Sequence, residues 1–90
     1  MLMQDLTGGK VAGSGIIQCP TKIVGGVLIS ADTSNDVTVQ IRKGGPTGAL
    51  IFDLVTRVPV FMGAPFSADS QIYYSVSGAN GYAQIFGWAE

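Results

Sequence analysis

The sequence contains no histidine, a single cysteine and few charges. Its 90 residues include five Lys and Arg against six Asp and Glu, which gives a net charge of −1, and only 12% of the residues are charged. Without His there is no side chain that titrates near neutral pH and no imidazole ligand for zinc, copper or haem. Ser and Thr therefore lack a His base to activate them. We expect a protein that is not an enzyme, with no catalytic residue, metal site or cofactor.

The sparse charges also bear on the partners. Positive charge is scattered along the chain, at Lys10, Lys22, Arg42, Lys43 and Arg57. Because nucleic-acid binding needs a basic patch that contacts phosphates, we expect no nucleic-acid partner. Residues 70–89 are uncharged, but they contain Ser, Gln, Asn and Gly, which a membrane-spanning helix would not tolerate. We therefore expect no membrane partner.

Cys19 and two short motifs carry little chemistry. A lone cysteine cannot form an intramolecular disulfide, which indicates synthesis in a reducing cytosol, and Cys19 is expected to be a small half-buried residue. Gly8-Gly9-Lys10 lacks the preceding Gly and the following Ser or Thr of a phosphate-binding loop. Residues 32–36 offer oxygen atoms that could face Ca²⁺, but their spacing fits a turn better.

Glycine and proline interrupt every stretch that could form a long helix. There are 13 Gly and four Pro, and the apolar runs between them are short. The fold class is therefore predicted to be all-β, a small antiparallel β-sandwich or jelly roll of seven to eight short strands, with a small closed barrel as the alternative. A flexible Gly-rich N-terminal arm, residues 1–14, is expected to precede one domain, residues 15–90, and to order only against a neighbouring subunit. Strands are expected at 15–19, 22–30, 36–43, 49–56, 58–61, 71–77 and 82–89.

Alternation within these strands predicts which side chains are buried. Residues 36–43 alternate between apolar and polar side chains, with Val37, Val39 and Ile41 on one face. In the next strand Leu50, Phe52 and Leu54 are predicted to be core, because Asp53 marks the opposite face. The pair Gly25-Gly26 predicts a bulge or bend within 22–30, and 58–61 is predicted to be a short edge strand beside Pro59.

Asn80-Gly81 predicts a type I′ hairpin between 71–77 and 82–89. This turn would place Val76 opposite Ile85, Tyr74 opposite Gly87, and Tyr73 opposite Trp88, with the Tyr74 ring covering Gly87. The predicted core face has few hydrogen-bonding groups and consists of Ile72, Tyr74, Val76, Ala83, Ile85 and Gly87. The predicted outer face consists of Tyr73, Ser75, Ser77, Tyr82, Gln84, Phe86 and Trp88. The alternative places Phe86 and Trp88 in the core.

The apolar side chains left without cover are the candidate interface residues. A small domain with few charges gains from burying such side chains against copies of itself or a larger partner. We therefore expect a homo-oligomer that also binds another protein. The alternative is that the surface aromatics have no binding role. The candidates are Tyr73, Tyr82, Phe86 and Trp88, together with Phe61, Met62 and Phe66.

Three segments carry a resemblance to a known class of proteins: 22–32 (KIVGGVLISAD), 35–41 (NDVTVQI) and 71–78 (QIYYSVSG). They resemble small β-sandwich proteins of tailed-bacteriophage virions. The resemblance implies a capsid decoration (cement) or head–tail accessory protein, made in the host cytoplasm and carried in the virion in many copies. Its implied partners are copies of itself and the major capsid protein or another virion protein, and it implies no catalytic residue. As the alternative, the outer aromatics would bind a glycan or receptor in a phage fibre, spike or tail.

Overall fold

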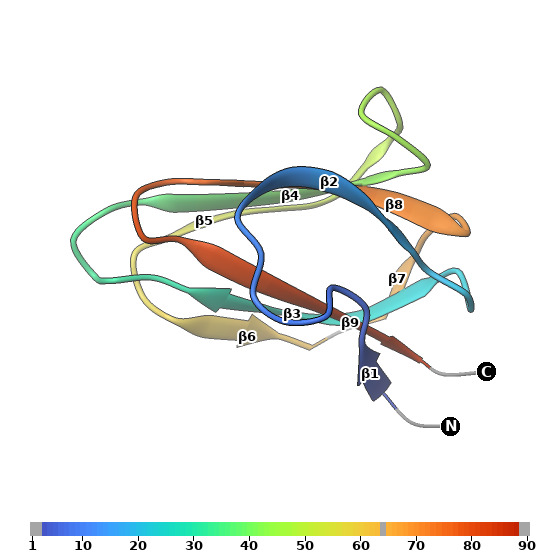
Figure 1. Cartoon of the computed structure of the whole chain (residues 1–90), viewed down its shortest axis with the longest axis horizontal. Helices are drawn as coiled ribbons and strands as arrows, with labels where there is room; N and C mark the ends of the chain where they lie inside the picture. Colours follow the sequence, from blue (N-terminus) through green and yellow to red (C-terminus); the bar gives the residue numbers. More distant parts are fainter. Residues whose placement is uncertain (1–2, 64, 89–90) are drawn as a thin grey trace.

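The computed structural model describes residues 3–63 and 65–88, and this part of the chain forms two antiparallel β-sheets without a helix (Figure 1). Sheet A has the strand order β1-β9-β3-β6, and β7 also pairs with β3. Sheet B has the order β2-β8-β4-β5. The strands are β1 (Met3–Asp5), β2 (Gly13–Gln18), β3 (Ile23–Ser30), β4 (Val37–Lys43), β5 (Leu50–Thr56), β6 (Val60–Met62), β7 (Phe66–Ser67), β8 (Gln71–Ser77) and β9 (Tyr82–Trp88).

The strands pair in a nested order. The innermost pair is β4 with β5, and around it β3 pairs with β6 and β7. Outside these, β2 pairs with β8, and β1 pairs with β9. Successive pairs alternate between sheet B and sheet A, so the chain repeatedly crosses from one sheet to the other. The predicted all-β class is confirmed, but residues 3–63 and 65–88 form nine strands rather than the seven to eight predicted.

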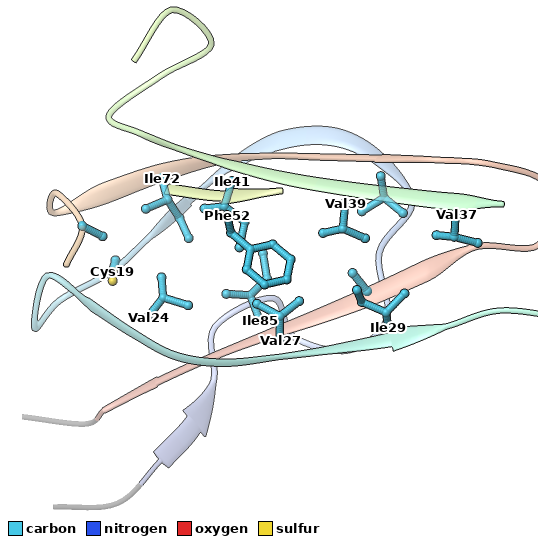
Figure 2. Packing of buried hydrophobic residues seen from close by; sticks show 13 residues of the cluster. Cys19, Val24, Val27, Ile29, Val37, Val39, Ile41, Phe52, Ile72 and Ile85 are labelled. Atoms are coloured by element: carbon cyan, nitrogen blue, oxygen red, sulfur yellow. The ribbon is translucent and has the colours of Figure 1, made fainter. Parts of the chain in front are cut away.

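The core lies between the two sheets, as in a β-sandwich (Figure 2). Both sheets contribute β-branched side chains, which suit the pleated surface of a strand. The buried hydrophobic residues are Cys19, Val24, Val27, Ile29, Val37, Val39, Ile41, Phe52, Ala68, Ile72, Val76, Ala83 and Ile85. The alternation predicted for β4 is confirmed, because Val37, Val39 and Ile41 are all fully buried.

The strand pairing has two irregularities, of which the sequence predicted one. The register of β3 against β9 shifts between Val24 and Gly26, which confirms the bulge predicted at the glycine pair. The register of β4 against β5 shifts between Ile41 and Arg42, and Leu50 then pairs with Arg42 on the outer side. The prediction that Leu50 is core is therefore wrong, and the side chain is 42% exposed. Phe52 is buried as predicted, and Leu54 is half-buried against the core.

The predicted hairpin between β8 and β9 is wrong, because the two strands belong to different sheets. Residues 78–81 cross from sheet B to sheet A. A type I′ turn needs positive φ at both central residues, but only Asn80, at 58°, has it, while Gly81 does not. Gly81 instead packs against Val37, where an added Cβ would lie 2.7 Å from Cγ1. The loop thus turns over the end of β4 rather than returning within one sheet.

The pairs predicted for this hairpin are replaced by others. Val76 pairs with Gly13 and Val39, Tyr74 with Gly15 and Ile41, and Tyr73 with Ile16 and Arg42. Trp88 pairs with Met3. The Tyr74 ring lies against Gly15 rather than Gly87, since an added Cβ at Gly15 would be 2.9 Å from Tyr74 Oη. The predicted core face nevertheless holds, because Ile72, Val76, Ala83, Ile85 and Gly87 are buried and Tyr74 packs on the core.

The N-terminal segment, expected to be an arm, makes contacts within the chain. β1 pairs with β9, Leu6 N donates to Ile85 O, and Val11 bridges Ala83 through two backbone hydrogen bonds of 2.9 Å. β2 then begins at Gly13, inside the range expected for the arm. A neighbouring subunit is not required for these contacts. The mobility of the segment in solution stays a prediction.

Candidate functional site

The outer face of sheet A carries most of the candidate interface residues. Along β9 the side chains of Tyr82, Gln84, Phe86 and Trp88 alternate with the buried residues of the core. By register, neighbouring strands add apolar side chains to the same side. We call this surface the aromatic face, and its members are Met3, Leu28, Phe61, Tyr82, Phe86 and Trp88. Phe61 is 49% exposed and Tyr82 is 42% exposed, while Phe86 and Trp88 are half-buried.

The glycine pair, Gly25 and Gly26, lies directly beneath two of these rings. A Cβ added to Gly25 would be 2.9 Å from Cζ3 of Trp88, and one added to Gly26 would be 2.6 Å from Cζ of Phe61. Both glycines are buried although they face outward. The absence of side chains lets the rings lie on the backbone of β3, an arrangement in which an aromatic residue covers a glycine in a strand.

Two rings of the aromatic face, those of Phe61 and Phe86, also contact each other. The ring centroids of Phe61 and Phe86 are 6.2 Å apart with an interplanar angle of 64°, which is the favoured edge-to-face geometry. Phe61 comes from β6 and Phe86 from β9, and β3 with its glycine pair runs between them. The glycine contacts of Phe61 and Trp88 and the contact between Phe61 and Phe86 therefore position these three side chains before any partner binds.

One carboxylate, Asp5, lies on the same side of sheet A. Its Oδ2 accepts a hydrogen bond of 3.0 Å from Gln84 Nε2 and one of 2.7 Å from Gly9 N, and its Oδ1 accepts bonds from Thr7. Burial raises the pKa of Asp5, but the hydrogen bonds from Thr7, Gln84 and Gly9 outweigh it and lower the pKa below its ordinary value. The carboxylate thus stays charged near neutral pH and orders the loop that follows β1.

The structure brings together four of the predicted interface residues and separates the others. Tyr82, Phe86, Trp88 and Phe61 share the aromatic face. Met62 is 40% exposed at the end of edge strand β6. Phe66 is half-buried, and its ring meets the Phe52 ring edge-on at a centroid distance of 5.6 Å, so the chain itself covers it.

Tyr73 lies on the other side of the molecule, on the outer face of sheet B. Its neighbours by register are Ile16 and Arg42. Most other members of that surface by register are polar, and we call it the polar face; they include Ser14, Thr38, Gln40, Asp53, Ser75 and Ser77. Leu50 and Val55 also lie on the polar face and are 42% and 56% exposed. Tyr73 and Trp88, predicted to lie side by side, therefore face opposite directions. The separation follows from placing β8 and β9 in different sheets.

Sequence reasoning missed Met3 and Leu28 as members of the aromatic face. Met3 belongs to the segment expected to be a flexible arm, and Leu28 belongs to an apolar run without alternation, so the sequence does not indicate which face it occupies. The glycine pair was the available signal, because two adjacent glycines in a strand mark a place where another group approaches the backbone closely.

Other chemistry is sparse in the described residues. Cys19 is fully buried, and burial raises the pKa of its thiol, which disfavours the reactive thiolate. No three His, Cys, Asp or Glu side chains come together there as metal ligands would. Residues 3–63 and 65–88 also form no pocket. No helix in the described part of the chain is long and apolar enough to span a membrane.

Comparisons with known proteins do not add a function. No protein-family model, curated protein or solved structure matches the chain. The aromatic face and the glycine pair beneath it are thus the features that bear most directly on what the chain does.

Proposed function

We propose that this chain is a non-enzymatic structural protein of a virion, a capsid decoration protein that self-associates and binds the major capsid lattice. The observation that carries the proposal is the aromatic face held on the glycine pair. Side chains that are ordered before binding lose less conformational entropy when a partner covers them. Buried aromatic side chains near the centre of an interface contribute much of its binding free energy. The face is therefore suited to a lasting contact with another protein.

The architecture supports the same proposal by analogy. We infer that the two sheets form a jelly roll, because first and last strands pair outermost, fourth and fifth pair innermost, and successive pairs alternate between the sheets. Viral capsid proteins and lectins are among the proteins built on that architecture. One fold serves many functions, so the aromatic face carries more weight than the topology.

A second candidate is a glycan- or receptor-binding module of a phage fibre, spike or tail. The observation that favours it is the environment of Tyr82 at one end of the aromatic face. Tyr82 is exposed, pairs with Ser30 across the sheet, and lies two residues from Gln84. An aromatic ring beside hydroxyl and amide groups can stack on a sugar ring and bind its hydroxyls.

The test compares the same substitution on the two faces. Tyr82→Ala removes an exposed ring from the aromatic face, and Tyr73→Ala is its matched control on the polar face. Both variants and Phe61→Ala are produced with the virion components, and their copies per purified particle are counted by quantitative mass spectrometry. We expect hundreds of copies of the wild-type protein per particle. Tyr82→Ala and Phe61→Ala are expected to lower occupancy at least tenfold, while Tyr73→Ala leaves it unchanged.

The free energy of unfolding of each variant is measured alongside, so that lost occupancy is not mistaken for lost folding. Equal occupancy of all three variants and the wild type would overturn the role of the aromatic face. A handful of copies per particle, with glycan binding that Tyr82→Ala abolishes, would replace the decoration protein by the fibre, spike or tail module.

A further inference from the structure

Strand β2 forms an open edge of sheet B. Among the described strands its one partner in the sheet is β8, and Figure 1 shows β2 in the foreground of the upper sheet. The six residues, GSGIIQ, contain no charge and no proline, and their register against β8 has no shift. An edge of this kind presents unpaired backbone N–H and C=O groups to another chain.

The other sheet edges in the described part of the chain are better protected against such pairing. At the opposite end of sheet B, β5 carries Asp53 and the register shift beside Arg42. In sheet A the edge strands β1 and β6 are three residues long, and Pro59 precedes β6. Charges, bulges, prolines and short length are the usual devices that block edge-to-edge association. Strand β2 has none of them.

The hydrogen bond that follows β2 identifies which of its backbone groups are free. Cys19 N donates to Ser70 O at 2.7 Å, one step beyond the pair Gln18–Gln71. In an antiparallel ladder, alternate residues direct both their N–H and C=O groups to the same neighbour. The odd-numbered residues of β2 therefore bond to β8. The even-numbered residues, Ser14, Ile16 and Gln18, direct their backbone groups to the open side.

The same three residues also share one face of the sheet. Ile16 pairs with Tyr73 on the polar face and is 50% exposed, whereas Ile17 packs on the core. A strand that extends sheet B without reversing its two faces must pair its own outward residues with Ser14, Ile16 and Gln18. Hydrogen bonding and side-chain direction thus both require that an incoming strand pairs its outward residues with Ser14, Ile16 and Gln18.

We propose that two copies of this chain pair antiparallel through β2, with the two Ile16 residues opposite each other at a two-fold axis. In this register Ser14 of each copy lies opposite Gln18 of the other, so all three free residues find partners at once. The result is a continuous eight-stranded sheet. A second copy meets both the hydrogen-bonding and the side-chain requirement, because the residues with free backbone groups are symmetric about Ile16. In addition, β2 carries no charge that would repel its own copy.

The pairing has a geometric consequence for the proposed function, on which this part of the inference rests. A two-fold axis perpendicular to sheet B keeps the outer side of sheet A pointing in one direction in both copies. The two aromatic faces of the dimer would then lie side by side and face the same surface. Two linked contacts to one lattice raise the overall affinity without any new kind of contact.

The first experiment places a charge at the proposed axis. Ile16→Lys puts two like charges directly opposite each other, which destabilises a strand pair. The matched control is Val55→Lys on edge strand β5, where the side chain is 56% exposed on the same face of sheet B. Sedimentation velocity over a concentration series is expected to show dimers for the wild type and Val55→Lys. The dissociation constant of Ile16→Lys is expected to rise at least 100-fold.

The second experiment tests the register and does not depend on how Ile16→Lys folds. In a Cys19→Ala background, Ile16→Cys places two thiols on residues whose Cα atoms are about 5.5 Å apart, within reach of a disulfide. Mild oxidation is expected to give a covalent dimer. Ser14→Cys alone and Gln18→Cys alone would leave thiols more than about 13 Å apart. Neither is expected to cross-link by itself, but a mixture of the two is.

The outcomes separate this inference from the proposed function. A wild-type protein that stays monomeric at about 0.5 mM would overturn the dimer, because even a Kd of about 1 mM gives some dimer at that concentration. An Ile16→Lys variant that dimerises like the wild type would also overturn it. A monomeric wild type that still loads onto particles would leave the decoration function standing. A cross-linked dimer that fails to bind particles would support the dimer and refute the decoration function.

Discussion

Asn80 donates a hydrogen bond from its side-chain Nδ2 to Oδ2 of Asp32 over 2.9 Å. The bond joins two loops that are far apart in the sequence, since Asp32 follows β3 and Asn80 precedes β9. Both loops cross from one sheet to the other, and Figure 1 shows them at the same end of the molecule. Asp32 also accepts hydrogen bonds from Ser34 and Asn35. This carboxylate therefore organises one end of the molecule.

The link predicts a pH dependence. The hydrogen bond from Asn80, followed by those from Ser34 and Asn35, lowers the pKa of Asp32 to about 2. The pKa of Asp in an unfolded chain is about 3.9. The stabilisation that the ionised Asp32 gives the folded state is therefore present above that pH and is lost as the pH falls toward 2. Asn80→Gly removes the donor and tolerates the φ of 58°.

We expect the variant to have a lower free energy of unfolding than the wild type near neutral pH, with a difference that shrinks between pH 4 and pH 2. Urea unfolding of both proteins at several pH values measures it. A difference that stays constant down to pH 2 would show that Asp32 does not mediate the effect.

Gly25→Ala should disturb the aromatic face. The new Cβ would meet the Trp88 ring at 2.9 Å, so the ring must shift. Overpacking of this kind costs about 1–3 kcal/mol of stability. Gly45→Ala is the matched control, because its Cβ would have no heavy atom within 4 Å. Chemical denaturation together with Trp fluorescence checks both. Equal stability and unchanged fluorescence of the two variants would contradict the contact between Trp88 and Gly25.

Phe52→Ala should be among the most damaging core substitutions. The side chain is 7% exposed and packs edge-on against Phe66, so truncation leaves a cavity between the sheets and should cost about 3–5 kcal/mol. Leu50→Ala on the same strand serves as the control and should cost less than about 1 kcal/mol, because Leu50 faces outward. Comparable losses in denaturation midpoints for the two variants would argue against the register shift in β5.

Thr33→Asn should stabilise the protein. Thr33 has a φ of 69°, in the left-handed region that β-branched residues rarely adopt and that Asn tolerates much better. Relief of this strain is expected to raise the free energy of unfolding by about 1 kcal/mol. Ser34→Asn, at a neighbouring position outside that region, should change it by less than about 0.5 kcal/mol. A destabilised Thr33→Asn would mean that the hydroxyl bond from Thr33 to the Asp32 carbonyl outweighs the strain.

Local patterns predicted the strands and their faces well. Alternation gave the buried side of β4, β8 and β9, because the side-chain period of two does not depend on which strand lies alongside. Local patterns did not predict which strands pair with each other. Asn80-Gly81 has the composition of a two-residue hairpin turn, but the packing of Gly81 on Val37 took the chain to the opposite sheet. Such a contact, between residues 44 positions apart in the numbering, has no local signal.

The candidate site was predicted in its residues but not in its arrangement. Phe86 and Trp88 face outward as expected, yet the ring nearest Phe86 is Phe61 of β6, whose place in the sheet depends on pairing with β3. Tyr73 was assigned to the same surface only through the predicted hairpin. Leu50 was misplaced for a related reason, because a single extra residue in the β4–β5 pairing reverses the face of every residue beyond it.

The nested pairing sets an order in which the molecule can assemble during synthesis. Among the pairs of described strands, only β4 and β5 follow each other directly in the chain, and they can pair as soon as β5 has been made. β1 and β2 pair with β9 and β8, which come last among the described strands, so their edges stay unpaired until those two strands have been made. Pairings between distant segments also fold slowly. A newly made chain should therefore spend its most aggregation-prone interval with the uncharged residues of β2 exposed.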